Sequence, residues 1–496
     1  MGDLSRRIDD ALAGWGTHPV LVEVNGAGES VSVDAPVFRT IVTGIARECT
    51  RNGVGPDTKV ALFLENSVTT VATIVALIGI GAIPVFAKLE YRRRELTVIF
   101  DDIDPDAVIA EEGYLPVLAP FLRGTDEAGG YGVTRREIGN DRYGTGDRYG
   151  QRPRGIATQH AGAGGVSWIT PVPGSRRDTR LSDEVVSINC TYRGDGTLLG
   201  SMATEKQYLL GAQVLQDGLQ AQRGDTMLYP IPMSHIFTLV GCIFVPLFYG
   251  ITGVIARTVH PRVLFEAIAG YDVNHITAVP EIYRLLLRSK GADRSFPSLR
   301  SFVSGGSVLE AEEWESLGRE FAVEVLHGYG LTEFTPVSRN IRGASRGGTV
   351  GPVCDGLCVE IADPDGEGRG EIRIRGDALG RGYLGNPGAT AAAFHDGWFY
   401  TGDRGHFEEE HLVFDTELKG TRKINGVIVD LEEVRRAFLA ASIAADAEVF
   451  VDGNSVVALV EMPESADIEK EEKRIRQILR YQLAPYKIPR RIARRR

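Results

Sequence analysis

Two segments carry polar residues of the types that bind a nucleotide and a metal ion. In LHGYGLTEFTP (326–336), the Tyr329 ring can stack on a base, the Thr332 hydroxyl can bond a phosphate, and Glu333 offers the hard oxygen that Mg²⁺ prefers. In FYTGDRG, the carboxylate of Asp403 lies in a glycine-flanked turn and can accept two hydrogen bonds from a ribose diol. Each segment alone is equally compatible with a solvated turn, but together they predict a nucleotide site.

A third segment, CTYRGDGTLLGS (190–201), follows the apolar run EVVSI. Gly194, Gly196 and Gly200 give it the composition of a loop whose backbone N–H groups cradle phosphates. Such loops usually carry a lysine near their end, and here that position is Leu199. Two interpretations stay open: an altered phosphate loop, or a decayed loop in a protein that no longer binds ATP.

Four further residues are candidates for function when they are considered together with these segments. The double glycine Gly305-Gly306 ends an apolar run and would let a flat ring approach the backbone. His235 lies in the apolar segment PIPMSHIFTLVG, where a buried structural histidine is the alternative. Lys487 lies in the proline-bounded segment APYKIPRRI near the C-terminal end.

The elements that must position these residues alternate in type along the chain. Val/Ile-rich runs separated by helical patterns predict crossover units and largely parallel sheets. The predicted strands are 59–66, 83–87, 106–112, 184–188, 226–232, 253–256, 275–280 and 301–306, with a helix at 68–82. Residues 122–183 are rich in Gly and Arg and are interpreted as a long surface excursion.

The last 80 or so residues form a separate unit in the pattern, with a boundary near Lys419-Gly420. Asn425-Gly426 and Asp452-Gly453 each separate two strand-like arms, which predicts two hairpins. Helical patterns follow each hairpin.

Bulk properties exclude several classes of protein. The net charge of −11 over 496 residues argues against a nucleic-acid partner. The five scattered cysteines and the absence of a signal-peptide pattern favour a reduced, cytoplasmic protein. The apolar stretches 71–86 and 242–256 are short and broken by Gly and Pro, so we expect buried helix and strand pieces rather than membrane spans.

In this order, the segments resemble the adenylate-forming superfamily, which includes acyl- and aryl-CoA synthetases, amino-acid-activating adenylation domains and firefly luciferase. The resemblance runs over nearly the whole chain, from VALFLENS to PYKIP. It implies an α/β fold with a large N-terminal domain (1–418), made of stacked α/β sheets plus a β-barrel-like subdomain. A small, mobile α+β lid domain (419–496) would follow and carry a catalytic lysine.

The resemblance also implies roles for individual residues. Lys487 would be the catalytic lysine, Glu333 the Mg²⁺ ligand, Thr332 a phosphate contact and His235 the gate of the acid pocket. The hinge would be Lys419 and Gly420, and the acceptor face of the lid would include Lys423, Asn425 and Gly426. The residues implied for ATP and AMP are Thr191, Arg193, Gly194, Gly196, Thr197, Gly305, Gly306, Ser307, Tyr329, Gly330, Thr332 and Asp403.

This sequence departs from the family in two motifs. The family loop reads roughly TSGTTGxPKG; laid alongside it, TYRGDGTLLG differs at Tyr192, Arg193 and Leu199, and Arg193 is the candidate to restore a positive charge. In the hinge motif, Glu417 falls where an arginine usually approaches the ribose and Lys419 where an acid usually lies.

The implied chemistry is attack of a carboxylate on the α-phosphate of ATP, with Mg²⁺, to give an acyl- or aryl-adenylate, followed by transfer to a thiol. The thiol would be coenzyme A or the phosphopantetheine of a carrier protein. MSHIF lacks the aspartate that holds an amino-acid ammonium, and its apolar neighbours suit an aryl or acyl group. The alternatives are another acceptor (an amine, or nitrite in diazo formation) and a non-catalytic binding protein that keeps a relic nucleotide site.

Overall fold

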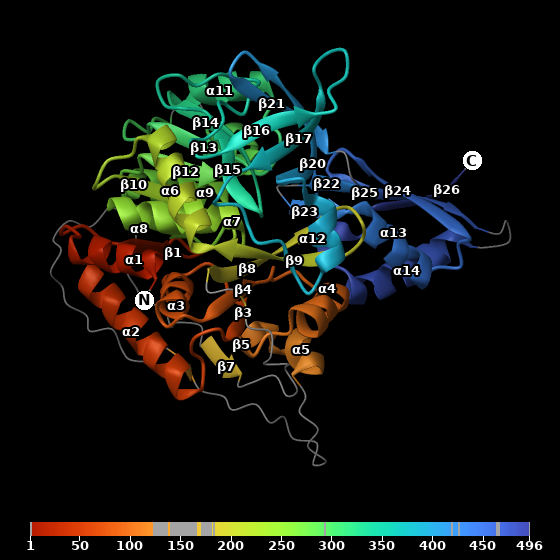
Figure 1. Ribbon diagram of the computed structural model, residues 1–496, viewed down its shortest axis with the longest axis horizontal. Coiled ribbons are helices and arrows are strands. Elements are labelled where there is room, and N and C mark those ends of the chain that lie inside the picture. Colours follow the sequence, from red (N-terminus) through yellow and green to blue (C-terminus); the bar gives the residue numbers. More distant parts are fainter. Residues whose placement is uncertain are drawn as a thin grey trace.

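The structure is a computed structural model and is shown in Figure 1. It describes residues 2–122, 137–138, 166–169, 181, 184–291, 294–417, 420–424, 427–462 and 467–495, with backbone alone for 137–138 and 166–169. Lys419, Asn425 and Gly426 lie outside the described residues, as does most of the excursion at 122–183.

Two eight-stranded sheets form most of the N-terminal region. The first is parallel from β14 to β1, with antiparallel strands at both edges. Its strands, in spatial order, are β15 (Phe334–Arg339), β14 (Glu324–Leu331), β13 (Ser301–Ser304), β12 (His275–Ala278), β10 (Thr226–Tyr229), β11 (Thr252–Ala256), β1 (Leu21–Val24) and β2 (Ser30–Val33). Its central strands are buried on both faces, which explains their continuous Val/Ile-rich runs.

The second sheet has a parallel centre of β8, β4, β3 and β5. Its strands, in spatial order, are β18 (Tyr383–Leu384), β9 (Leu198–Thr204), β8 (Val185–Tyr192), β4 (Ile83–Phe86), β3 (Lys59–Phe63), β5 (Ala107–Glu111), β7 (Val166–Ile169) and β6 (Glu137–Ile138). The last two lie within the segment interpreted as a surface excursion, so part of that segment extends the sheet edge.

A helix between the two sheets makes them one layered unit. Helix α3 contacts β1 of the first sheet and β4 of the second, which explains why apolar residues occupy almost its whole circumference. The Ser67 hydroxyl caps it by accepting from the Thr70 amide. The helices are α1 (Asp3–Ala13), α2 (Ala35–Arg51), α3 (Val68–Gly79), α4 (Arg93–Val98), α5 (Leu115–Leu118), α6 (Glu205–Leu219), α7 (Ile236–Thr238), α8 (Val245–Tyr249), α9 (Pro261–Gly270), α10 (Pro280–Ser289), α11 (Ala311–Phe321), α12 (Pro387–Ala393), α13 (Leu431–Ala441) and α14 (Ile468–Gln482).

A five-stranded antiparallel half-barrel sheet completes the N-terminal region, with its own apolar core. Its strands are β16 (Cys358–Ala362), β17 (Gly370–Arg375), β20 (Trp398–Glu408), β19 (Phe394–His395) and β21 (His411–Glu417). This sheet corresponds to the β-barrel-like subdomain that the family resemblance implies, and this part of the fold is confirmed.

The C-terminal part, blue in Figure 1, is a smaller α+β unit with a separate core. It contains the strands β22 (Thr421–Ile424), β23 (Val427–Asp430), β24 (Asp446–Asp452), β25 (Ser455–Glu461) and β26 (Arg491–Arg494), together with α13 and α14. Strand β23 packs on β8, and α14 packs on α4, so this lid lies against the N-terminal region.

The two apolar stretches that resemble membrane spans are internal elements. The first forms α3 and β4, and the second forms α8 and β11 together with the π-helical turn Leu239–Phe244. Among the residues that the structure describes, no helix combines the length and the apolar character needed to cross a bilayer.

Candidate active site

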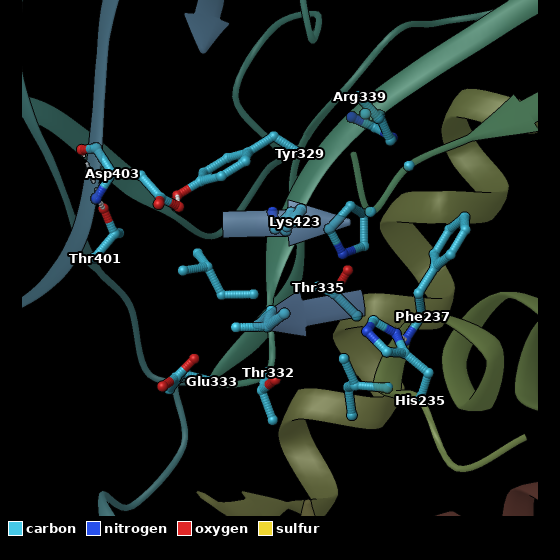
Figure 2. A pocket seen from close by; sticks show the side chains of 18 of the residues that line it. His235, Phe237, Tyr329, Thr332, Glu333, Thr335, Arg339, Thr401, Asp403 and Lys423 are labelled. Carbon is cyan, nitrogen blue, oxygen red and sulfur yellow. Dashed lines mark hydrogen bonds between the residues drawn. The ribbon is translucent and has the colours of Figure 1, made fainter. Parts of the chain in front are cut away.

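One pocket of about 1130 Å³ collects most of the predicted nucleotide residues from distant parts of the chain. Figure 2 shows its lining: Asp403 and Glu333 lie on one side, and His235 and Phe237 on the other. The predicted residues that line it are Thr191, Arg193, His235, Gly305, Gly306, Tyr329, Gly330, Thr332, Glu333, Asp403 and Lys423. Several come from the carboxyl ends of β13 and β14, where ligands of parallel sheets usually bind.

Asp403 is held by its neighbours on β20 and β14. Its carboxylate accepts a hydrogen bond from the Tyr329 hydroxyl at 2.7 Å, and its amide donates to the Thr401 hydroxyl at 3.0 Å. Burial, together with Glu417, which lies opposite it on β21, raises the pKa of Asp403 to about 6, although Lys423 acts in the opposite direction. Tyr329, predicted to stack on a base, therefore also orients the candidate ribose acceptor.

Glu333 is 2% exposed and accepts a hydrogen bond from the Tyr383 hydroxyl. Within the described ranges, no cluster of three or more His, Cys, Asp or Glu side chains could hold a metal. A single carboxylate is nevertheless the donor set that suits Mg²⁺ in nucleotide sites, where phosphates and water supply the other ligands. Glu333 and the adjoining Thr332 fit that role.

His235 caps α7 and lines the pocket. Its Nδ1 accepts from the Phe237 amide at 3.3 Å, which leaves Nε2 to carry the proton. Burial lowers its pKa to about 3, and the nearby cations Lys88 and Lys423 contribute in the same direction. The imidazole is therefore neutral near pH 7 and acts as an aromatic wall rather than a cation.

The candidate phosphate loop is the tight turn of the β8–β9 hairpin, and it leads into a strand rather than directly into a helix. Gly194 and Gly196 have φ of +84° and +80°, the left-handed backbone that glycine tolerates. The Gly196 amide donates at 3.0 Å to the carboxylate of Asp430, a lid residue whose other oxygen caps α13. The loop thus holds an anion here, but that anion is a carboxylate of the protein itself.

The two loop residues that depart from the family have definite partners. Arg193 lines the pocket and donates to the carbonyls of Thr401, at 3.0 Å, and Tyr400, at 2.5 Å. Leu199, in place of the usual lysine, is 2% exposed and packs in the half-barrel core. The position is therefore part of an apolar core.

Four predicted ATP residues do not line the pocket. The Thr197 amide donates to the Asp195 carboxylate, and the Ser307 hydroxyl donates to the Glu281 carboxylate at 2.9 Å. Gly194 and Gly196 also lie outside the pocket lining, because the lid covers their turn.

Lys487 also lies away from this pocket, although its side chain is fully buried. Its ammonium lies 2.8 Å from a Glu95 oxygen, 2.5 Å from a Glu433 oxygen and 2.7 Å from the Tyr192 hydroxyl. Glu95 and Tyr192 belong to the N-terminal region, so this buried cluster fastens the lid to it. Sequence patterns gave no sign of Glu95, because its contact with Lys487 joins positions 392 residues apart.

The lid presents a different lysine to the pocket. Lys423 on β22 is among the lining residues, together with Thr421 and Ile428 of the same hairpin. Gly420, the described half of the predicted hinge, lies against the phosphate loop: a Cβ there would be 3.4 Å from the Gly194 carbonyl oxygen. Figure 2 shows Lys423 between Tyr329 and Thr335.

Comparisons with known proteins identify the family of the chain. The family model described as AMP-binding enzyme matches residues 24–137 and 200–384, more than half of the chain; the loop at 190–199 and the lid lie outside those segments. The protein 4-coumarate–CoA ligase-like 4 of Oryza sativa subsp. japonica is 28% identical over 363 residues, covering 69% of this chain and 64% of that relative. The matched region thus spans less than two thirds of the relative's length.

Two solved structures share the fold. A double mutant of o-succinylbenzoate CoA synthetase from Bacillus subtilis superposes with a TM-score of 0.77 at 18% identity, over 98% of this chain and 93% of that one. The amide bond synthetase McbA from Marinactinospora thermotolerans gives a TM-score of 0.77 at 20% identity, over 100% and 96%. With the family-model match, these findings confirm the resemblance found in the motifs: the chain belongs to the AMP-binding enzyme family, within the adenylate-forming superfamily.

Proposed function

We propose that this protein activates a small aryl or acyl carboxylic acid with ATP and Mg²⁺ and transfers the acyl group to a thiol, that of coenzyme A or of a carrier protein. The observation that carries the proposal is the single pocket that joins Asp403, Thr332 and Glu333 to an apolar end beside His235 and Phe237. A nucleotide and an acid bound at these two ends would meet between them.

In the first step, a carboxylate oxygen of the acid attacks the α-phosphorus of ATP, and the bond from that phosphorus to the pyrophosphate oxygen breaks. Asp403 orients the ribose, and Thr332 contacts the phosphates. Glu333 would hold Mg²⁺, which when bound would neutralise negative charge on the phosphates. The attacking and attacked groups are both anionic, so a cation between them stabilises the transition state, and Lys487 is the candidate.

That step requires the lid to move. Lys487 is held in the buried cluster with Glu95 and Glu433, and Asp430 occupies the Gly196 amide that a phosphate would use. Lid release would free the loop amide and the lysine together. The arrangement seen here suits the second step, because Lys423 faces the pocket while Lys487 is withdrawn.

In the second step, the sulfur of the thiol attacks the acyl carbon and AMP leaves with the bonding electron pair, which its phosphate readily accepts. The thiol loses its proton to solvent. Lys423 would stabilise the negative charge that develops near the leaving phosphate.

Exchange of labelled pyrophosphate into ATP, run with a panel of aryl and acyl acids, tests the first step. We expect exchange with at least one acid, and release of AMP when coenzyme A or a carrier protein is then added. Lys487→Ala should abolish exchange but retain thioester formation from synthetic adenylate, and Lys423→Ala should do the reverse. Lys470→Ala, on the exposed face of α14, is the matched control.

Two outcomes would contradict the proposal. Absence of exchange with every acid, together with absence of ATP binding by calorimetry, would favour a binding protein with a relic site. Exchange followed by AMP release only with an amine would keep the adenylation and replace the thiol acceptor.

A further inference from the structure

A buried arginine lines the pocket on the side away from the candidate ribose acceptor. Arg339 ends β15 and is 7% exposed. Figure 2 shows it across the pocket from Asp403 and Glu333, on the side of Phe237 and His235. Its charge therefore lies at the acid end of the site.

A glycine in helix α6 leaves space for the Arg339 side chain. Gly218 lies within the helix, where glycine weakens helical structure. A Cβ at Gly218 would lie 2.7 Å from Nε of Arg339 and 2.9 Å from its Cδ, closer than side-chain atoms approach one another. The glycine therefore makes room for the arginine, at a cost to the helix.

The guanidinium lacks the partners that a buried charge needs. Among the described residues, the guanidinium makes one hydrogen bond, a weak one from a terminal nitrogen to the Cys354 sulfur at 3.5 Å, and its Nε–H has no acceptor. Burial raises the pKa of Cys354 to about 12, so the thiol carries no compensating charge. In the described part of the chain, no carboxylate pairs with Arg339, and the nearby Asp217 and Asp355 are exposed.

Apart from Lys423, whose charge acts on both His235 and His327, the described residues that line the rest of this side of the pocket are apolar or neutral. Leu215 and Leu219 of α6 and Leu326 of β14 form apolar walls. His235 is neutral near pH 7, as described above, and so is His327, whose pKa burial lowers to about 4. A buried, unpaired cation is costly unless an anion joins it, so the missing counter-charge points to the ligand.

We infer that Arg339 selects an acid substrate that carries a second carboxylate, at the end remote from the carboxylate that is activated, with an apolar body between the two. The forked guanidinium binds a carboxylate through two parallel N–H···O bonds, which gives direction as well as charge. The inference rests on the proposed function, since it assumes that the acid enters this pocket to be adenylated.

Matched acids test the inference. Pyrophosphate exchange would be measured with aliphatic and aryl dicarboxylic acids, each paired with its own monomethyl ester and with the monocarboxylic acid of equal length. We expect kcat/KM to favour one dicarboxylic acid over both of its partners by about 100-fold. In Arg339→Met, that preference should fall below about tenfold, through a rise in KM for the dicarboxylic acid with kcat nearly unchanged.

Arg339→Lys is the conservative control: it keeps the charge but loses the fork, and it should recover part of the preference. Calorimetry of each acid on the wild-type protein provides a readout that does not depend on the variants folding. There, the dicarboxylic acid should bind and its monomethyl ester should bind at least tenfold more weakly.

The outcomes separate this inference from the proposed function. Exchange that favours monocarboxylic acids, or a preference that Arg339→Met leaves unchanged, overturns the role of Arg339 while the adenylation stands. Absence of exchange with all acids overturns the proposed function. Calorimetry of the acids on the wild-type protein then tests the role of Arg339 by itself, and equal binding of a dicarboxylic acid and its monomethyl ester overturns that role.

Discussion

The cluster around Lys487 predicts that one substitution in the N-terminal region will release the lid. Glu95 on α4 is fully buried, lies 2.8 Å from the Lys487 ammonium and also accepts from the Ala484 amide at 3.2 Å. Replacing Glu95 by Gln keeps the shape and one hydrogen-bond acceptor but removes a charge from the contact. Glu433 would then be the one remaining carboxylate beside the buried Lys487 ammonium.

The size of the effect follows from the type of contact. Hydrogen bonds to charged groups contribute about 1.5–3 kcal/mol, and removing one partner of a buried ion pair costs about 3–5 kcal/mol. Because glutamine retains the acceptor, the lower range applies. A loss of about 1.5–3 kcal/mol lowers the ratio of docked to undocked lid by about 10- to 150-fold.

The ratio of docked to undocked lid is measured by limited proteolysis near the hinge and by the rates of the two half-reactions. In Glu95→Gln we expect faster cleavage between the domains, faster formation of adenylate if release of Lys487 limits that step, and slower thioester formation. Tyr481→Phe is the matched control, because Tyr481 joins the same α4–α14 interface through a 2.8 Å bond from Arg93 but is 55% exposed. It should change stability by less than about 0.5 kcal/mol. Equal protease sensitivity in Glu95→Gln and wild type would refute the reasoning.

Three further perturbations test the nucleotide end of the site. Asp430→Asn keeps an oxygen to cap α13 but turns an NH2 group, which cannot accept a hydrogen bond, toward the Gly196 amide, so ATP affinity by calorimetry should rise about fivefold, the value of a hydrogen bond of about 1 kcal/mol. Burial raises the pKa of Asp403 to about 6, so lowering the pH through about 6 protonates the ribose acceptor and should weaken ATP binding; Glu417→Gln should move that transition to lower pH, since Glu417 raises the pKa. Leu199→Lys would restore the family residue but bury a cation in an apolar core, so it should destabilise the protein by several kcal/mol in thermal unfolding rather than improve ATP binding, whereas Leu199→Met should cost less than about 1.5 kcal/mol.

Each of these has an outcome that contradicts it. Unchanged or weaker ATP binding in Asp430→Asn would mean that the lid carboxylate and the nucleotide do not compete. A flat pH profile between 5 and 7 would remove Asp403 from the ribose. A stable Leu199→Lys variant with tighter ATP binding would show that the side chain escapes the core to reach the phosphates.

The sequence predicted most of the fold because local patterns determine it. The Val/Ile-rich runs became β3, β10, β12 and β13. The hairpin predicted at Asp452-Gly453 became β24 and β25, joined by the two-residue turn 453–454 with Gly453 at positive φ, one residue later than predicted, since a turn that needs positive φ is a local property. The pocket that joins Asp403 with Glu333 followed from motif order. The end of the candidate phosphate loop was harder to predict, because the glycine and small residues of β9 are typical of a loop rather than of a strand.

Contacts between distant segments set the limit of what the sequence could predict. Arg339 stands in VSRNIRG, which reads as an ordinary polar stretch, and its burial depends on Gly218 in a helix 121 residues earlier in the chain. Tyr192 was visible only as a departure from the family loop; the structure shows it bonded to Lys487 and Glu433. Which lysine faces the pocket depends on the position of the lid, and no pattern within the lid encodes that position.

The altered loop and the lid position are connected through one amide. A phosphate loop with lysine holds its ligand by charge as well as by backbone, but this loop offers N–H groups without that cation, and the Asp430 carboxylate already uses the Gly196 amide. ATP that needs this amide can bind only to molecules whose lid has moved, so its observed affinity is the intrinsic affinity multiplied by the fraction of such molecules. Under the proposed function, departure of pyrophosphate would free the amide again, Asp430 could return, and the same movement would bring Lys423 to the pocket and bury Lys487. Departure of the first product would thereby favour the arrangement that serves the second step.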